Sequence, residues 1–98
     1  MIVERANAMV INVNGTSLFY ETSGNGAPLL LLHGNGEDHH IFDALADKLA
    51  ADFTVYSIDS RNHGQSEKTD DYAYETMAMD VYAFIDALQL GPSQYYRL

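Results

Sequence analysis

The chain has 98 residues, with 14 acidic against 5 basic side chains and a formal net charge of −9. A chain of this length forms a single domain, residues 1–98, and buries only about 60 to 65% of the surface that its unfolded form exposes. Its negative charge repels phosphate backbones and anionic lipids, so neither nucleic acid nor a membrane surface is expected as a partner.

We expect no targeting signal in the N-terminal segment. Residues 1–9 include charged side chains where a signal peptide is apolar, and the leucine run at 29–32 is far too short to span a bilayer. We therefore expect a cytoplasmic protein. The strand pattern begins at Met9, so residues 1–8 are expected to be a disordered leader. The chain has no cysteine, which excludes a disulfide framework and a thiolate nucleophile.

The first predicted element is a β-hairpin. Residues 10–13 and 17–21 are rich in β-branched and aromatic side chains, and Asn14-Gly15 between them supplies the positive φ angles of a tight turn. After a break, residues 29–32 form an apolar run without an alternating polar residue. Such a run is typical of a strand buried on both faces, which requires helices on both sides of the sheet.

A helix, a strand and a second helix follow. Ile41, Leu45 and Leu49, with Phe42 and Ala46 beside them, recur at helical spacing and predict an amphipathic helix. The next strand is predicted at residues 53–58, and a second helical pattern runs over residues 77–88.

The last predicted element is a fifth strand at residues 94–98, after Gly91 and Pro92 end the second helix. The order hairpin, strand, helix, strand, helix, strand predicts an α/β fold whose later strands are parallel, with helices on both faces. In such a sheet the functional loops lie beyond the carboxyl ends of the strands.

His33-Gly-Asn-Gly36 follows the central predicted strand and precedes a helix. Backbone N–H groups at such a position can point at a developing negative charge, and glycine lets the backbone come close. The same glycines also suit a strand-to-helix turn that needs positive φ only for steric reasons, so this segment alone leaves both interpretations open. We expect Gly34 to have positive φ and His39, further on, to lie at the surface.

The same segment imitates a dinucleotide-binding fingerprint. Gly34-Asn-Gly36 lies between a strand and a helix, and Asp59 ends the next strand about 20 residues later. The third glycine of that fingerprint is His39 here, and the leading hairpin has no place before the first strand of a dinucleotide-binding fold. No nucleotide cofactor is therefore expected.

A second glycine-containing loop, Asp59-Ser-Arg-Asn-His-Gly-Gln-Ser66, follows the next strand. From Met9 onward, the two loops and the elements around them resemble the N-terminal portion of the α/β-hydrolase fold family. The second loop resembles the family's Asp-x-Arg-Gly-x-Gly-x-Ser motif, with Asn62 in place of the first glycine. Asparagine can adopt the same left-handed conformation, so the loop is expected to be kept. The resemblance implies a partial α/β-hydrolase sheet with the strand order 1-2-4-3-5.

The resemblance also implies residue roles. In this family the residue after His-Gly contributes its backbone N–H to the oxyanion hole, which assigns that role to Asn35, with His33, Gly34 and Gly36 shaping the loop. The second loop is expected to lie beside the first, next to the active site, and to be structural. Its implied residues are Asp59, Arg61, His63, Gly64 and Ser66.

The implied reaction is cleavage of an ester, thioester or amide by a serine nucleophile, with a small-molecule acyl substrate. Epoxide hydrolases and haloalkane dehalogenases of the family carry proline at the position of Gly36. This glycine therefore favours the esterase, thioesterase and peptidase branches.

The nucleophile itself should stand in a Gly-x-Ser-x-Gly frame. Gly91-Pro-Ser93-Gln-Tyr95 approaches that frame but ends in tyrosine and follows a helix, and no other serine has glycine on both sides. In the family the acid and the histidine follow the nucleophile in the chain. None of the four histidines here fits the catalytic role.

The four histidines, His33, His39, His40 and His63, could in principle converge on a metal. Adjacent His39 and His40 point in different directions on a helix, and no cysteine or spaced carboxylate completes a ligand set. We therefore expect no metal site.

We expect this chain to stop before the nucleophile turn and to supply only the oxyanion-hole loop of a hydrolase. The alternative is a non-catalytic truncated product or interaction module that keeps the hydrolase-like sheet. In both cases the strand at 94–98 would leave unpaired N–H and C=O groups at the sheet edge, so we expect a homo-oligomer formed through that edge.

Overall fold

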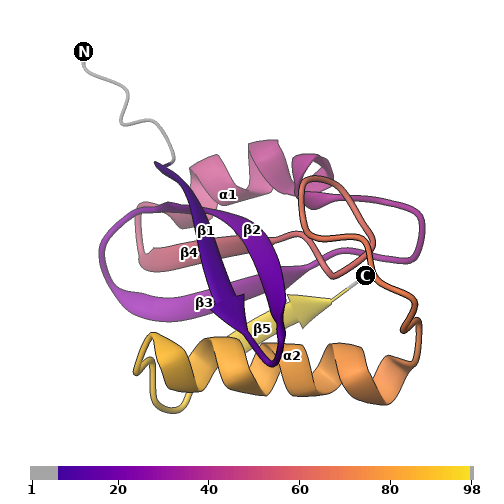
Figure 1. The fold of residues 1–98 in the computed structure, drawn as a ribbon. Coiled ribbons are helices and arrows are strands. Elements are labelled where there is room, and N and C mark those ends of the chain that lie inside the picture. Colours follow the sequence, from indigo (N-terminus) through magenta and orange to yellow (C-terminus); the bar gives the residue numbers. More distant parts are fainter. Residues whose placement is uncertain (1–6, 98) are drawn as a thin grey trace.

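The computed structural model describes residues 7–97, and within them one mixed five-stranded sheet (Figure 1). Strands β1 (Asn7–Val13) and β2 (Thr16–Ser23) form the antiparallel hairpin. Strands β3 (Ala27–Leu32), β4 (Phe53–Ile58) and β5 (Gln94–Arg97) are parallel to one another. The spatial order β1-β2-β4-β3-β5 confirms the predicted order.

The hairpin begins earlier than predicted. Asn7 and Ala8, assigned above to a leader, pair with Thr22 and Glu21 as part of β1, because the ladder with β2 extends to its end. The rest of that predicted leader, residues 1–6, lies outside the described residues. At the turn Asn14 has φ +50° and Gly15 has φ +72°, which confirms the two positive φ angles expected there.

The sheet separates two hydrophobic clusters, one under each helix. Helix α2 (Tyr74–Ala87) packs on one face, where Phe84 belongs to one buried cluster with Leu18, Tyr20 and Leu30. Helix α1 (Asp43–Leu49) covers the opposite face, over Leu31 and its neighbours. Figure 1 shows the two helices on opposite sides of the strands, so the prediction of helices on both faces is confirmed.

The entry to α1 differs from the predicted apolar stripe. Residues 39–42 form a short 3₁₀ helix, η1 (His39–Phe42), which turns every three residues rather than every 3.6. This shift in phase turns Phe42 into the core and leaves Ile41 41% exposed. Leu45 and Leu49 keep their predicted place against the sheet.

Helix α2 (Tyr74–Ala87) starts three residues earlier and ends one residue earlier than the predicted range of 77–88. Leu88 is its C-cap and Gln89 has φ +54°. The N–H of Leu90 donates to the carbonyl of Ile85 at 3.0 Å, and that of Gln89 to Asp86 at 3.1 Å, which is the hydrogen-bond pattern of a Schellman motif. Gln89 thus takes the left-handed position that ends the helix, ahead of Gly91.

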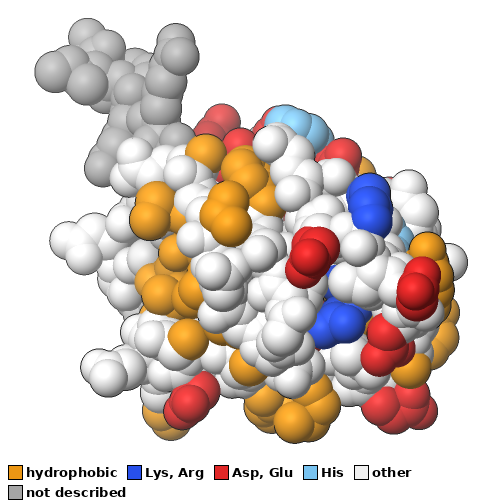
Figure 2. All heavy atoms as spheres, viewed as in Figure 1, with side chains coloured by type: hydrophobic (Ala, Val, Ile, Leu, Met, Phe, Trp, Pro, Cys, Tyr) orange, Lys and Arg blue, Asp and Glu red, His pale blue; other side chains and the backbone are white. Residues whose placement is uncertain are grey.

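Several large apolar side chains remain exposed. Figure 2 shows hydrophobic side chains on the face of the hairpin and along the side of α2. The large exposed residues are Met9, Val10, Ile41, Tyr72, Tyr74, Met79, Tyr82 and Tyr95. Across the described part of the chain, no helix has the length and apolar character needed to cross a membrane.

Candidate functional site

Two loops meet at the carboxyl edge of the parallel strands. The first loop, residues 33–38, follows β3, and the second loop, residues 59–67, follows β4. The two strands end in register, with Leu32 opposite Ile58, so the loops leave the sheet side by side. The prediction that they are neighbours at this edge is confirmed.

The first loop turns on Gly36 rather than on Gly34. The N–H of Glu37 donates to the carbonyl of Gly34 at 3.2 Å, and Gly36 has φ +81° as the third residue of this four-residue turn. A type II turn requires positive φ at that position. The expectation for Gly34 was therefore wrong, because the His-Gly dipeptide precedes the point where the chain reverses. Asn35 is exposed, and no acceptor within the described residues binds its backbone N–H.

The two loops are joined by a pair of histidines. His33 accepts the backbone N–H of Ser60 on Nε2 at 3.0 Å, and His63 accepts the backbone N–H of Gly36 on Nε2 at 3.1 Å. The ring centroids are 5.0 Å apart. Each loop thus holds a backbone amide of the other, which fixes the turn around Asn35 relative to the sheet.

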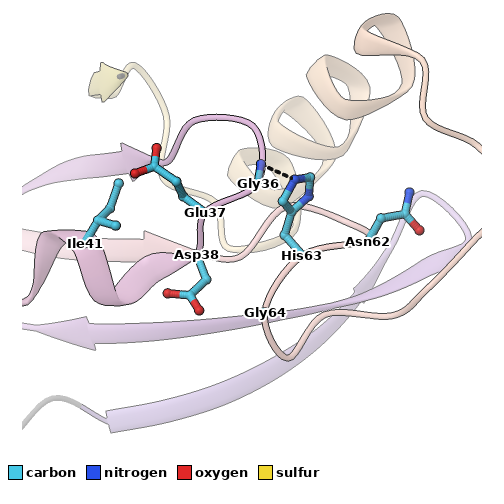
Figure 3. Close-up of a pocket in the computed structure, with 7 residues that line it drawn as sticks. All are labelled: Gly36, Glu37, Asp38, Ile41, Asn62, His63 and Gly64. Atoms are coloured by element: carbon cyan, nitrogen blue, oxygen red, sulfur yellow. Dashed lines mark hydrogen bonds between the residues drawn. The ribbon is translucent and has the colours of Figure 1, made fainter.

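An open pocket of about 550 Å³ lies where the loops meet (Figure 3). Figure 3 shows the hydrogen bond between Gly36 and His63 bridging the two loops. The pocket is lined by Gly36, Glu37, Asp38, Ile41, Asn62, His63 and Gly64. Asn35 precedes Gly36, one of these lining residues, in the chain.

Asp59 is completely buried below the second loop. Its Oδ2 accepts the N–H of Gln65 at 2.9 Å, and its Oδ1 accepts the N–H and Nδ1 of His39 at 2.7 and 2.8 Å. Gly64 lies over the carboxylate, and a Cβ there would be 2.3 Å from Oδ2. Asp59 therefore holds the second loop together, and its burial keeps the carboxylate from solvent.

His39 is 1% exposed, so the expectation of a surface residue was wrong. Its Nδ1 faces Asp59 at 2.8 Å and its Nε2 faces Glu21 at 3.2 Å. The 3₁₀ geometry of η1 turns this side chain inward, whereas its neighbour His40 stays in solvent beside Asp43. Nothing in the spacing of apolar residues signals this placement.

Arg61 forms a buried bidentate ion pair with Asp80 of α2. Nε donates to Oδ2 at 2.7 Å and Nη2 to Oδ1 at 2.8 Å, and the side chains are 7% and 4% exposed. The hydrogen bond with Asp80 raises the pKa of Arg61. Asn14 at the hairpin turn donates to the same carboxylate at 2.9 Å. Asp80 was missed in the sequence, although an acidic residue on the apolar face of a helix signals a buried partner.

The remaining motif residues hold the second loop against the hairpin. Ser66 donates from Oγ to the carbonyl of Asp59 at 2.6 Å and accepts the N–H of Phe19 at 2.8 Å. Asn62 has φ +69°, which confirms the left-handed conformation expected where the motif usually has glycine. Its side chain donates to the carbonyl of Asp71 at 2.9 Å.

One group in the described part of the chain has the composition of a metal site. Ligand atoms of Asp38, His39 and Asp59 all lie within 4.8 Å of one another. Nδ1 of His39 and Oδ1 of Asp59 are bound to each other at 2.8 Å, and Asp38 caps η1 by accepting the N–H of His40. A metal would have to displace these hydrogen bonds, and the other histidines considered as ligands do not join this group.

Comparison with known proteins identifies similar chains. A sequence profile of the alpha/beta hydrolase fold matches residues 27–94. The 1H-3-hydroxy-4-oxoquinoline 2,4-dioxygenase of Pseudomonas putida is 47% identical over 81 residues, covering 79% of this chain and 30% of that protein. The soluble epoxide hydrolase of Corynebacterium sp. (strain C12) is 38% identical over 77 residues, covering 78% of this chain and 27% of that protein.

A solved structure shows the same fold. The crystal structure of epoxide hydrolase VrEH1 from Vigna radiata matches with a TM-score of 0.89 at 23% identity, covering 94% of this chain and 31% of that one. The chain thus spans 27 to 31% of the length of these three proteins.

Proposed function

This chain belongs to the α/β hydrolase fold family, and from that premise we propose that it supplies the oxyanion-binding loop of an enzyme that cleaves an ester, thioester or amide. The observation that carries the proposal is that Asn35 is exposed and its backbone N–H binds no acceptor among the described residues. It stands in a turn fixed by Gly36 and His63, beside the pocket.

A fixed donor of this kind suits acyl transfer. Attack on a carbonyl places negative charge on its oxygen, and a backbone N–H that is already oriented stabilises that charge without reorganising. Removal of one such donor typically costs about 100- to 1,000-fold in turnover. In the proposed enzyme the second donor follows the nucleophile, which lies outside these residues together with the catalytic acid and histidine.

None of the serines in this chain is proposed as the nucleophile. Ser66 and Ser57 are buried, and Ser66 uses its hydroxyl to join β2 to the second loop. Ser93 donates to the carbonyl of Gly91 at 3.1 Å, as a turn residue does. The proposal therefore expects the isolated chain to be inert toward esters and to resist labelling by a serine-directed fluorophosphonate. Stoichiometric labelling would contradict it.

A second candidate follows from the relative that is 47% identical, because its name describes a dioxygenase rather than a hydrolase. A hydroxy-oxo ring that loses a proton also carries an anionic oxygen, so the same N–H of Asn35 could hold such a substrate. The complete enzyme would then consume oxygen with 3-hydroxy-4-oxoquinoline and leave acyl esters intact. Oxygen uptake and ester hydrolysis, measured side by side, separate the two reactions.

A non-catalytic truncated product or interaction module is the remaining alternative, and an anion-binding experiment distinguishes it. Phenylphosphonate, which mimics an acyl oxyanion, is titrated into the ¹⁵N-labelled chain while the backbone amide of Asn35 is followed by NMR. Asn35→Pro removes this N–H, and proline is favoured at the second position of a type II turn, so the turn is kept. Asn35→Ala is the matched control, because it keeps the N–H.

The proposal expects a saturable shift of the residue 35 amide in the wild type and in Asn35→Ala. It expects weakened binding in Asn35→Pro, followed through the Gly36 amide. In the complete enzyme, Asn35→Pro should lower turnover by about 100- to 1,000-fold. Equal phosphonate affinity in the two variants would reject the oxyanion role and favour the interaction module.

A further inference from the structure

The two histidines that join the loops share one protonation state. Each uses Nε2 to accept a backbone N–H of the other loop, from Ser60 to His33 at 3.0 Å and from Gly36 to His63 at 3.1 Å. A nitrogen that accepts such a bond carries no proton, so the network assigns the proton of each ring to Nδ1. Both Nδ1 atoms lie near a backbone carbonyl, at 2.7 and 3.0 Å, and can donate to it.

We propose that His63 is a positioning residue that sets the first loop through Gly36, and that protonation of the His33 and His63 pair releases this loop. Protonation puts a hydrogen on Nε2, which then faces the amide hydrogen of Gly36 or Ser60. Two donors cannot share a hydrogen bond, so both cross-loop contacts are lost. With the rings 5.0 Å apart, two imidazolium charges also repel each other.

The consequence concerns the turn that carries Asn35. Glu37 and Gly34 close this turn locally at 3.2 Å, but among the described contacts only the Gly36 bond to His63 connects its far side to the second loop. When that bond is lost, the turn itself stays formed, but its orientation relative to the second loop is no longer fixed. This consequence rests on the proposed oxyanion role of Asn35, whereas the hydrogen bonds can be tested without it.

Several charged groups face the pair of histidines. Glu37 and Asp38 line the pocket with His63, and Asp59 immediately precedes the Ser60 amide that His33 accepts. Lys68 brings a positive charge to the second loop, with its Nζ 3.4 Å from the carbonyl of Gly64. The guanidinium of Arg61 points to Asp80 instead, and its charge is paired there.

Substitution can separate the hydrogen bond from the charge. His63→Gln supplies a side-chain oxygen that accepts the N–H of Gly36 and does not titrate, whereas His63→Ala removes the acceptor. His40→Gln is the matched control, because the exposed ring of His40 contacts Asp43 and His39, and its backbone N–H to Asp38 is kept in the variant. The wild type and these three variants are compared as ¹⁵N-labelled 98-residue chains.

The experiment measures the hydrogen bonds by NMR. Imidazole ¹⁵N shifts report the tautomer, and scalar couplings across the hydrogen bonds report the Gly36–His63 and Ser60–His33 pairs. At alkaline pH we expect Nδ1–H tautomers and both couplings; as the pH falls, both couplings disappear together with the neutral imidazole signals. His40→Gln should behave as the wild type. In His63→Gln the Gly36 amide should stay protected at acid pH. In His63→Ala it should exchange about five- to tenfold faster than in the wild type at alkaline pH, and at the wild-type rate at acid pH, where the wild type has also lost the bond.

An Nε2–H tautomer of His63 at alkaline pH would overturn the proposal, and so would equal exchange of the Gly36 amide in His63→Ala and the wild type at alkaline pH. If His63→Ala does not fold, the tautomer and couplings of the wild type decide the question. Failure of phenylphosphonate to bind while the couplings are present would reject only the oxyanion role. Phosphonate binding without the couplings would reject only the positioning role.

Discussion

The buried pair of Arg61 and Asp80 predicts a large and specific loss of stability on Asp80→Asn. Asparagine keeps the shape of the side chain but removes its charge, which leaves the guanidinium of Arg61 buried beside a neutral amide. Breaking a buried ion pair by removing one partner costs about 3–5 kcal/mol. Asn14 adds to the effect, because its amide now donates to a weaker acceptor.

The magnitude matters because the domain is small. Its free energy of unfolding is expected to be about 5–15 kcal/mol, so a loss of this size removes a fifth or more of the total. In a domain of this length each kcal/mol shifts the melting temperature by about 4–8 °C, so Asp80→Asn should melt at least about 12 °C lower. The pKa of Arg61 is raised by its hydrogen bond with Asp80, and a raised pKa means that the charge is lost only as pH rises through that value. Arg61 therefore stays charged, and the loss should be equal at neutral and at moderately alkaline pH.

Urea unfolding followed by circular dichroism measures this prediction. Asp86→Asn, an exposed acidic residue on the same helix, is the control and should change the free energy of unfolding by less than about 0.5 kcal/mol. The double variant Arg61→Met with Asp80→Leu removes both charges and should recover most of the loss, since paired apolar replacement is often neutral. A change below about 0.5 kcal/mol in Asp80→Asn would refute this reasoning.

Three further predictions follow from the fold. His39→Ala should lower the free energy of unfolding by about 2–4 kcal/mol and His40→Ala by less than about 0.5 kcal/mol, because only His39 is buried; equal melting temperatures would contradict its burial. Gly64→Ala should be far more destabilising in urea than Gly36→Ala, because a Cβ at residue 64 meets Asp59 at 2.3 Å while none at residue 36 meets an atom within 4 Å. If the two variants unfold at the same urea concentration, the close approach of the residue 64 backbone to the Asp59 carboxylate is not needed for stability. The outer edge of β5 is unpaired in the described sheet, so the chain should sediment as a homo-oligomer at micromolar concentration, and a compact monomer would reject this association.

The fold was more predictable than the contacts within the site. Asn14-Gly15 and the apolar run of β3 identify their elements from local sequence, because each satisfies a local backbone or burial requirement. The strand order came from the resemblance to a family, since periodicity within a strand carries no information about its neighbours. The adjacency of the loops followed from the parallel direction of β3 and β4.

The site contacts depend on partners that are distant in sequence. Arg61 binds Asp80 across 19 positions, and no motif spacing encodes that pair. The inward position of His39 depends on a single turn of 3₁₀ helix, which the 3.6-residue pattern conceals. Gly34 and Gly36 are both candidates for the left-handed residue of the turn, and only the backbone trace selects Gly36.

The hairpin turn is completed by residues made much later on the ribosome. Asn14 binds Asp80 across 66 positions, and Thr16 binds Glu67 across 51. During synthesis Asn14 and Thr16 emerge long before their partners. Until Asp80 and Glu67 have been added, the side chains of Asn14 and Thr16 form their hydrogen bonds with water instead. Closing such long loops is entropically costly and slows folding. We therefore expect the hairpin turn to complete its native hydrogen bonds only after the second loop and α2 have been synthesised.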